Sequence, residues 1–349
     1  MINWIVTSSI LILIVIVLRF LLRGKISLRL QYALWLIVLI RLLVPFEFGA
    51  AEFSLLNQVE QIPIVREFES VQRMEEIEQI DEKHVQIIYE RTPEDVNRPV
   101  KIYEMTEEEF TRERTVFQTN EILSLLWKAG AAVMLAVFLI SNVRFGLKLT
   151  QTRKMLQAGE CGKTLPVYVS CAVETPCLFG LFRPVIYVTP EAAVRETVLR
   201  HTIEHETTHY LHKDHIWSFL RCIALAMHWY NPLVWFAVKL SKADGELACD
   251  EATIKRIGES ERAAYGRTLI EMTRPGRDIL LGMATTMTGS KSSLKERIEL
   301  IAKKPKMAAY TLVTVLLIAA VAAVCTFSGP VENPYHAWLQ LLTLLLLFH

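Results

Sequence analysis

The chain has 349 residues, of which 52% are hydrophobic and 21% are charged, and its formal net charge is +1. Its mean hydropathy of +0.29 is too high for an ordinary soluble globular protein. The near balance of acidic and basic residues gives no electrostatic reason to expect direct binding of nucleic acid. These features predict a protein whose apolar residues meet membrane lipid.

Four apolar runs account for the high hydropathy. They cover residues 2–18, 30–46, 122–143 and 307–328. A helix needs roughly 20 apolar residues to cross the hydrocarbon core of a bilayer. The first run follows no basic segment and has no small-residue cleavage site before Arg19, so we interpret it as a retained span and not as a signal peptide. The sequence therefore predicts a multi-pass membrane protein.

Three basic clusters predict the orientation of these spans. The basic residues of these clusters are Arg19, Arg23, Lys25, Arg29, Arg144, Lys148, Arg153, Lys154, Lys303, Lys304 and Lys306. By the positive-inside rule all three clusters face the cytoplasm, so the N-terminus lies outside. The predicted domains are two spans with a short cytoplasmic connector (1–46), an extracellular acidic loop (47–121), a third span (122–143), a cytoplasmic domain (144–306), a fourth span (307–328) and a short extracellular apolar tail (329–349).

The cytoplasmic region is predicted to hold a small sheet followed by helices. Strands are expected at residues 166–170 and 185–188, next to glycine and proline. Thr189 and Pro190 are typical of a helix start. The remaining expected elements are helices over 145–157, 194–212, 216–230, 233–257 and 262–273, a glycine-containing loop over 274–293, and two short strands of the outer loop at 86–89 and 100–103.

Residues 205–209 read His-Glu-Thr-Thr-His, which is an HExxH motif. Positions i and i+4 of a helix share a face, so His205 and His209 can reach one metal ion. Glu206 can then act as general base toward the attacking water. Zinc is the expected metal, because imidazole and carboxylate suit it and hydrolysis needs a redox-inert Lewis acid.

A later helix offers acids that would complete this site. Glu246 is the candidate third ligand, which would leave a fourth position open for water. Asp250 lies one turn later on the same face and is a candidate acceptor for the free N–H of a ligand histidine. Asp244 and Glu251 are competing acids nearby. Cys249, in the same stretch, is expected to be a reduced thiol packed as a small hydrophobe.

A second motif overlaps the first. His201, Glu204 and His205 match the inverted pattern HxxEH, with Glu204 as the base. We favour HExxH because the acids of the later helix complete that arrangement. Lys213 and Asp214 are interpreted as the polar end of the motif helix.

Taken together, these motifs resemble the bacterial membrane metallopeptidases of the BlaR/MecR type, the β-lactam sensor-transducers. The resemblance spans roughly residues 1–328 and rests on residues 176–184, 205–209, 213–214, 229–232, 246–250 and 293–298. It implies an α-helical integral membrane protein of the bacterial cell membrane with a cytoplasmic α+β gluzincin-like zinc metallopeptidase domain. It also implies zinc ligands His205, His209 and Glu246, catalytic Glu206, and transmembrane signalling through cleavage of the protein itself and of a transcriptional repressor.

The sequence departs from this family after the fourth predicted span. Sensor-transducers carry a penicillin-binding domain there, with an SxxK acylation motif, whereas only about 20 residues follow Ser328 here. Sensing of β-lactams by acylation is therefore not expected. The apolar tail is interpreted as a truncation artefact, an interfacial anchor or a contact with a second subunit of a homo-oligomer.

Two other functions compete with a signalling endopeptidase. One is a non-enzymatic membrane signalling scaffold with a structural zinc, and the other is an intramembrane protease. Glu206 and the open metal position favour the endopeptidase over the scaffold, while the polar neighbours of His205 argue against a site inside the bilayer. The 274–293 segment is the expected site of self-cleavage, because a loop can extend into a peptide-binding cleft.

Overall fold

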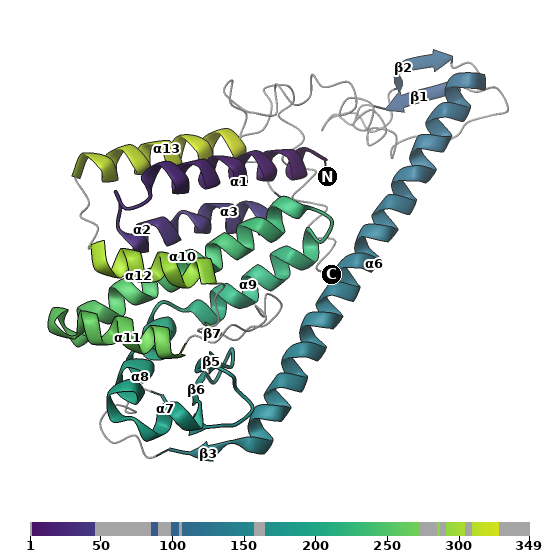
Figure 1. The fold of residues 1–349 in the computed structure, drawn as a ribbon. Helices are drawn as coiled ribbons and strands as arrows, with labels where there is room; N and C mark the ends of the chain where they lie inside the picture. The colour runs from purple at the N-terminus through teal and green to yellow at the C-terminus, as the bar shows by residue number, and fades with distance from the viewer. Residues whose placement is uncertain are drawn as a thin grey trace. The chain divides into compact units, whose positions relative to one another are not determined.

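The computed structural model describes residues 2–45, 85–89, 99–104, 107–156, 165–272, 285–286, 291–303 and 309–327. The chain divides into two units (Figure 1). The first consists of Met1–Thr7, Glu47–Gly130 and Ser328–His349, and the second of Ser8–Phe46 and Ala131–Phe327. The second unit contains all the residues that the sequence marks as candidates for a metal site.

The described strands of the first unit form an antiparallel pair. β1 (Val85–Tyr89) pairs with β2 (Pro99–Glu104), with Val85 opposite Glu104. Valine, isoleucine and tyrosine dominate both strands, and these residues fit a pleated surface. The strands predicted at residues 86–89 and 100–103 are thereby confirmed, whereas most of the acidic loop lies outside the described residues.

Two described helices are long and apolar enough to cross a membrane, judged by length and composition alone. They are Trp4–Leu22 within α1 (Ile2–Leu22) and Glu121–Thr152 within α6 (Glu107–Thr152). The helix expected over residues 145–157 is the end of α6 and not a separate element, and its predicted end is wrong, because α6 stops at Thr152 and Lys154–Met155 form a strand. No proline interrupts residues 107–152, and the charged residues at its start are good helix formers, so one helix runs throughout.

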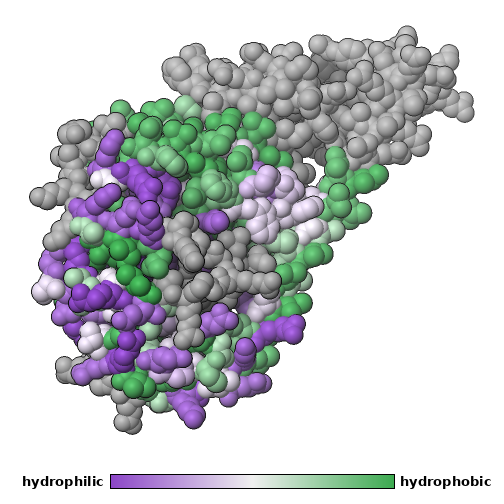
Figure 2. Space-filling view, viewed as in Figure 1, coloured by the Kyte–Doolittle hydropathy of each residue, from purple (hydrophilic) through white to green (hydrophobic). Residues whose placement is uncertain are grey.

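The other two apolar runs form shorter helices. Residues of the second run lie in α2 (Leu28–Ala33) and α3 (Trp35–Leu43), which meet at Leu34. Ser27 caps α2, because its hydroxyl accepts a hydrogen bond from the backbone N–H of Leu30. Most of the fourth run lies in α13 (Ala309–Phe327). Figure 2 shows apolar side chains gathered over α1 and α13. The exposed apolar residues of these two helices include Leu13, Val17, Val313 and Leu317.

A five-stranded sheet lies beside the motif helix, with the strand order β3-β4-β6-β5-β7. The strands are β3 (Lys154–Met155), β4 (Val167–Val169), β5 (Cys177–Phe179), β6 (Val185–Val188) and β7 (Thr285–Thr286). β4 and β6 are parallel, and the other pairs are antiparallel. The predicted strands correspond to β4 and β6. β5 was not predicted, since only three residues separate Pro176 from Gly180.

Helices build the rest of the second unit: α7 (Pro190–Val194), α8 (Glu196–Leu211), α9 (Asp214–Met227), α10 (Pro232–Ile257), α11 (Arg262–Met272), α12 (Lys291–Lys303) and a 3₁₀ turn, η3 (Glu259–Glu261). Thr189 caps α7 as predicted, with Pro190 in its first turn. The helix expected over 194–212 is α8, separated from α7 by Arg195 in an extended conformation.

The N-terminal helices pack against α9 and α10 in one apolar cluster, and a buried carboxylate joins them to α10. Asp244 is completely buried and accepts hydrogen bonds from Arg19 of α1 at 2.9 and 3.0 Å, from Gln31 of α2 at 2.7 Å and from Trp35 of α3 at 2.7 Å. A buried carboxylate is tolerated when a cation and further donors surround it. Asp244 therefore fastens α10 to the three helices and does not compete for the metal site.

Candidate metal centre

α8 places His205 and His209 one turn apart, with their rings facing a common point. The two Nε2 atoms are 3.1 Å apart, and the ring planes are nearly perpendicular. Both side chains are buried, because one side of α8 packs on the sheet through Ile203 and the other on α10. The predicted helical geometry of the HExxH motif is present in the structure.

Glu246 of α10 brings a carboxylate to the same point. Its Oε2 is 3.6 Å from Nε2 of His205, and its Oε1 is 3.6 Å from Nε2 of His209. Tetrahedral zinc with bonds of about 2.0–2.1 Å keeps its ligand atoms roughly 3.3 Å apart. The three side chains thus fit a single zinc ion both in donor chemistry and in spacing.

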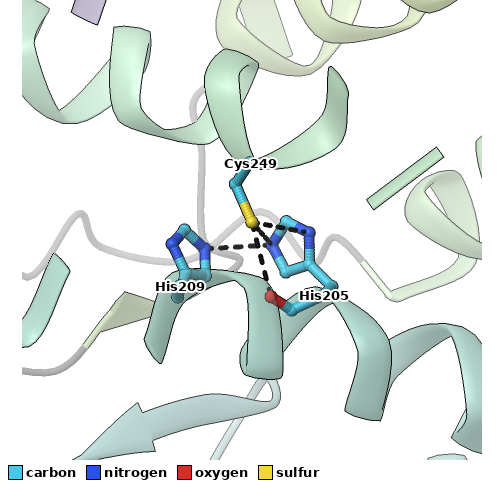
Figure 3. A group of neighbouring side chains, drawn as sticks. All are labelled: His205, His209 and Cys249. Carbon is cyan, nitrogen blue, oxygen red and sulfur yellow. Dashed lines mark hydrogen bonds between the residues drawn. The ribbon is translucent and has the colours of Figure 1, made fainter. Parts of the chain in front are cut away.

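Cys249 also lies at this point, as Figure 3 shows, and the sequence did not single it out as a donor. With His205 and His209 it forms a second triplet of possible metal donors. Its Sγ is 4.0 Å from Nε2 of His205 but 3.5 Å from Nδ1, and the thiol donates to the carbonyl oxygen of His205 at 3.4 Å. A ligand of a metal bound at Nε2 would lie nearer Nε2, so Glu246 is the better third donor.

Glu206 is completely buried beside the two histidines. Within the described part of the chain, no side chain forms a hydrogen bond with either of its carboxylate oxygens, and the backbone amide of Leu178 lowers its pKa. Burial raises the pKa of Glu206 above its usual value, while His209 and His205 pull it in the opposite direction. A buried polar atom without a partner is costly, so the pocket is suited to a water molecule or substrate that bonds to this carboxylate.

The free nitrogen of His205 is held by a chain of polar groups from three helices. Its Nδ1 is 2.7 Å from the hydroxyl of Tyr265 on α11, and that hydroxyl donates to Asp250 at 2.7 Å. Since Tyr265 gives its proton to Asp250, Nδ1–H of His205 donates to Tyr265, which leaves the lone pair on Nε2. Asp250 itself is 3.6 Å from Nδ1, so it acts on His205 mainly through Tyr265 and less directly than predicted.

Arg297 of α12 forms ion pairs with two acids of α10. Its guanidinium bonds to Asp250 at 2.7 and 2.8 Å and lies 3.1 Å from Glu246. Burial alone would raise the pKa of Glu246, but the positive charge of Arg297 is the largest of the opposing causes, which together hold this pKa well below its usual range. Glu246 therefore stays ionised, as a metal ligand must. Neither Arg297 nor Tyr265 was a predicted site residue.

The free nitrogen of His209 is held by Asp214, which the sequence analysis interpreted only as a polar helix end. Nδ1 of His209 lies 2.6 Å from Oδ2 of Asp214, whose Oδ1 accepts a hydrogen bond from the hydroxyl of Tyr32 at 2.8 Å. Lys213 adopts a left-handed conformation with φ 62°, and this turns the chain back between α8 and α9. The turn brings Asp214 to the histidine five residues earlier.

The residues of the inverted motif point elsewhere. His201 bonds to Thr268 at 2.9 Å and to Glu261 at 3.1 Å. Glu204 is partly exposed and forms an ion pair with Arg256 at 2.9 Å. Neither side chain joins His205 at the common point, so the geometry agrees with the HExxH reading of this helix.

A buried set of two histidines and a glutamate with a further buried glutamate beside it is typical of metallopeptidases. Residues 1–301 match the family described as BlaR1 peptidase M56, and the chain belongs to that family. The resemblance inferred from the motifs is thereby confirmed.

Curated relatives agree with the family. The chain is 26% identical over 191 residues to "Regulatory protein BlaR1" of Bacillus licheniformis, which covers 50% of this chain and 31% of that protein. It is 26% identical over 144 residues to "Methicillin resistance mecR1 protein" of Staphylococcus aureus (strain Mu50 / ATCC 700699), and to the protein of the same description in Staphylococcus epidermidis; each match covers 40% of this chain and 24% of the relative. The chain thus spans less than a third of the length of these relatives.

Proposed function

We propose that the chain is a membrane-embedded zinc endopeptidase of the gluzincin type, with His205, His209 and Glu246 as metal ligands and Glu206 as catalytic base. The observation that carries this proposal is the convergence of two imidazole nitrogens and the Glu246 carboxylate, at separations of 3.1–3.6 Å, beside a buried carboxylate that no described side chain pairs with. Membership of a peptidase family supports the same chemistry. Asp250 and Tyr265 would keep His205 in the tautomer that ligation requires.

The chain's own residues supply the proton transfers of peptide hydrolysis. A zinc ion bound here would act as a Lewis acid that polarises the peptide carbonyl and acidifies water. Glu206 takes a proton from the attacking water and then gives it to the leaving amine.

The endopeptidase is proposed to act in transmembrane signalling. Two of the similar proteins are described as a regulatory protein and a methicillin resistance protein, and this chain shares their peptidase family. The proposed substrates are the chain itself and a cytoplasmic regulator such as a transcriptional repressor. The alternative function, a signalling scaffold with a structural zinc, is favoured only by Cys249, whose sulfur is close enough to the histidines to be considered a further donor.

A backbone pairing supports cleavage within the 274–293 segment. Thr285–Thr286 of this segment forms β7, which runs antiparallel to β5 with Thr285 opposite Leu178. The backbone amide of Leu178 also lies close enough to Glu206 to lower the pKa of its carboxyl group. Addition of a strand to a sheet edge is a common way to hold an extended peptide. The segment therefore pairs with the strand that neighbours the proposed base.

Self-cleavage is tested by incubating wild type and Glu206→Gln in membranes and mapping fragments by mass spectrometry. We expect fragments that end within residues 274–293 in wild type and their loss in the variant, because Gln cannot accept a proton. Thr285→Pro should also reduce cleavage, since proline cannot donate to a strand partner. The absence of such fragments, or identical fragments in wild type and Glu206→Gln, would overturn self-cleavage.

The proposed topology places the N-terminus outside and residues 144–306 in the cytoplasm. Single cysteines that replace Glu78 or Glu108 are expected to react with an impermeant thiol reagent added to intact cells. A cysteine that replaces Lys295 is expected to react only after permeabilisation. The reverse pattern would show that the orientation predicted from the basic clusters is wrong.

A further inference from the structure

The two candidate ligand histidines are held at Nδ1 by groups from different parts of the chain. His205 is anchored by Tyr265 of α11, whereas His209 is anchored by Asp214, which is itself bonded to Tyr32 of α2. α2 belongs to the second apolar run, far from the metal ligands in the sequence. One side of the metal centre thus depends on the N-terminal helices.

Tyr32 is fixed between α9 and α10. Its side chain is 5% exposed, and its ring centroid lies 5.0 Å from that of Trp217 on α9. On α10 it faces Gly245, where an added Cβ would meet the Tyr32 ring at 3.3 Å. Gly245 directly precedes Glu246, so the ring packs against the backbone that carries the proposed third ligand.

The hydroxyl of Tyr32 holds the Asp214 carboxylate in place beside His209. It donates to Oδ1 of Asp214, while Oδ2 accepts the Nδ1 proton of His209. Asp214 is 2% exposed, so loss of the donor leaves a buried carboxylate oxygen without this bond. Without the bond from Tyr32, the Asp214 carboxylate is held at one oxygen only and can rotate. It then fixes the tautomer and the ring orientation of His209 less firmly.

We propose that Tyr32 is a positioning residue of the metal centre, which acts on the ligand His209 through Asp214, so that the N-terminal helices form part of this centre. The bonds from Arg19, Gln31 and Trp35 to Asp244 hold the same helices on α10 two residues before Glu246. Displacement of α1–α3 would therefore disturb two of the three ligands together. This inference rests on the proposed zinc site.

The test compares Tyr32→Phe with wild type in the full-length protein in detergent. Loss of a group that orients a ligand typically lowers metal affinity about 10–100-fold, and we expect a loss of zinc affinity in that range, measured by chelator competition. The d–d absorption spectrum of the Co²⁺-loaded protein should change as well, because it reports ligand geometry. The control Tyr187→Phe removes a hydroxyl from a buried tyrosine on β6, and its zinc affinity and spectrum should match those of wild type.

A double-mutant cycle separates positioning from a general packing effect. If Tyr32 acts through Asp214, Tyr32→Phe should cause little further loss of affinity in the Asp214→Asn background. Equal losses in both backgrounds, or an unchanged affinity and Co²⁺ spectrum in Tyr32→Phe while wild type binds zinc, would overturn the inference. Failure of wild type to bind zinc would instead overturn the proposed function on which it rests.

Discussion

Alanine in place of His205, His209 or Glu246 is expected to leave the purified protein almost without zinc. Each change removes one of three donors that lie within 3.6 Å of each other, and two protein ligands do not hold a catalytic zinc ion firmly. The measurement is the metal content per chain after gel filtration in the presence of a weak chelator. Wild type should retain one zinc ion.

Two controls make this result specific. His201→Ala should keep its zinc, because His201 bonds to Thr268 and Glu261. Cys249→Ser should also keep zinc, since its sulfur lies nearer Nδ1 than Nε2 of His205. If Cys249→Ser loses zinc as completely as Glu246→Ala does, the metal has four protein ligands, and the scaffold with a structural zinc becomes the better proposal.

Glu206→Gln is expected to lower the rate of peptide cleavage about 10²–10⁴-fold, the usual contribution of a general base. Zinc content should not change, because the two oxygens of Glu206 are not among the three proposed ligand atoms. The measurement is the rate of cleavage of a synthetic peptide spanning residues 274–293, followed by chromatography. Glu204→Gln is the matched control, since Glu204 is partly exposed and paired with Arg256.

The same pair of variants discriminates the two overlapping motifs. Under the HExxH reading only the change at Glu206 should be severe. A severe loss in Glu204→Gln together with a mild one in Glu206→Gln would show that the inverted motif is the functional one. Circular dichroism of both variants checks that each remains folded.

The centre of the site was predictable because its signals are local. The spacing of His205 and His209 places them on one helix face whatever the rest of the fold, and Glu246 is one of a few acids on a later long helix that could complete the site. The groups that orient the ligands were not predictable in this way. Tyr32, Tyr265 and Arg297 reach the site by tertiary packing, and a single tyrosine or arginine on a helix has no spacing that identifies such a role.

The predicted ends of helices were wrong where the local sequence signal was weak or ambiguous. Thr189 and Pro190 do begin a helix, but α7 ends after one turn and the motif helix starts anew at Glu196. The start of α6 was missed because hydropathy alone marks the apolar part of a helix and not its charged first turns. The role of Asp214 was not predicted, because the left-handed turn that brings it back to His209 occurs at Lys213. Glycine is the usual sequence signal for such a turn, and none is present there.

The buried carboxylate of Asp244 can be paired only after the N-terminal helices have waited for α10 to be synthesised. Its partner Trp35 leaves the ribosome 209 residues before Asp244 does. At 5–20 residues per second that gap lasts roughly 10–40 s. During this interval the donors of Arg19, Gln31 and Trp35 must be satisfied by water, by lipid headgroups or by an assembly factor. Premature departure of the first helices from the insertion site would leave α10 with a buried anion and no counterion.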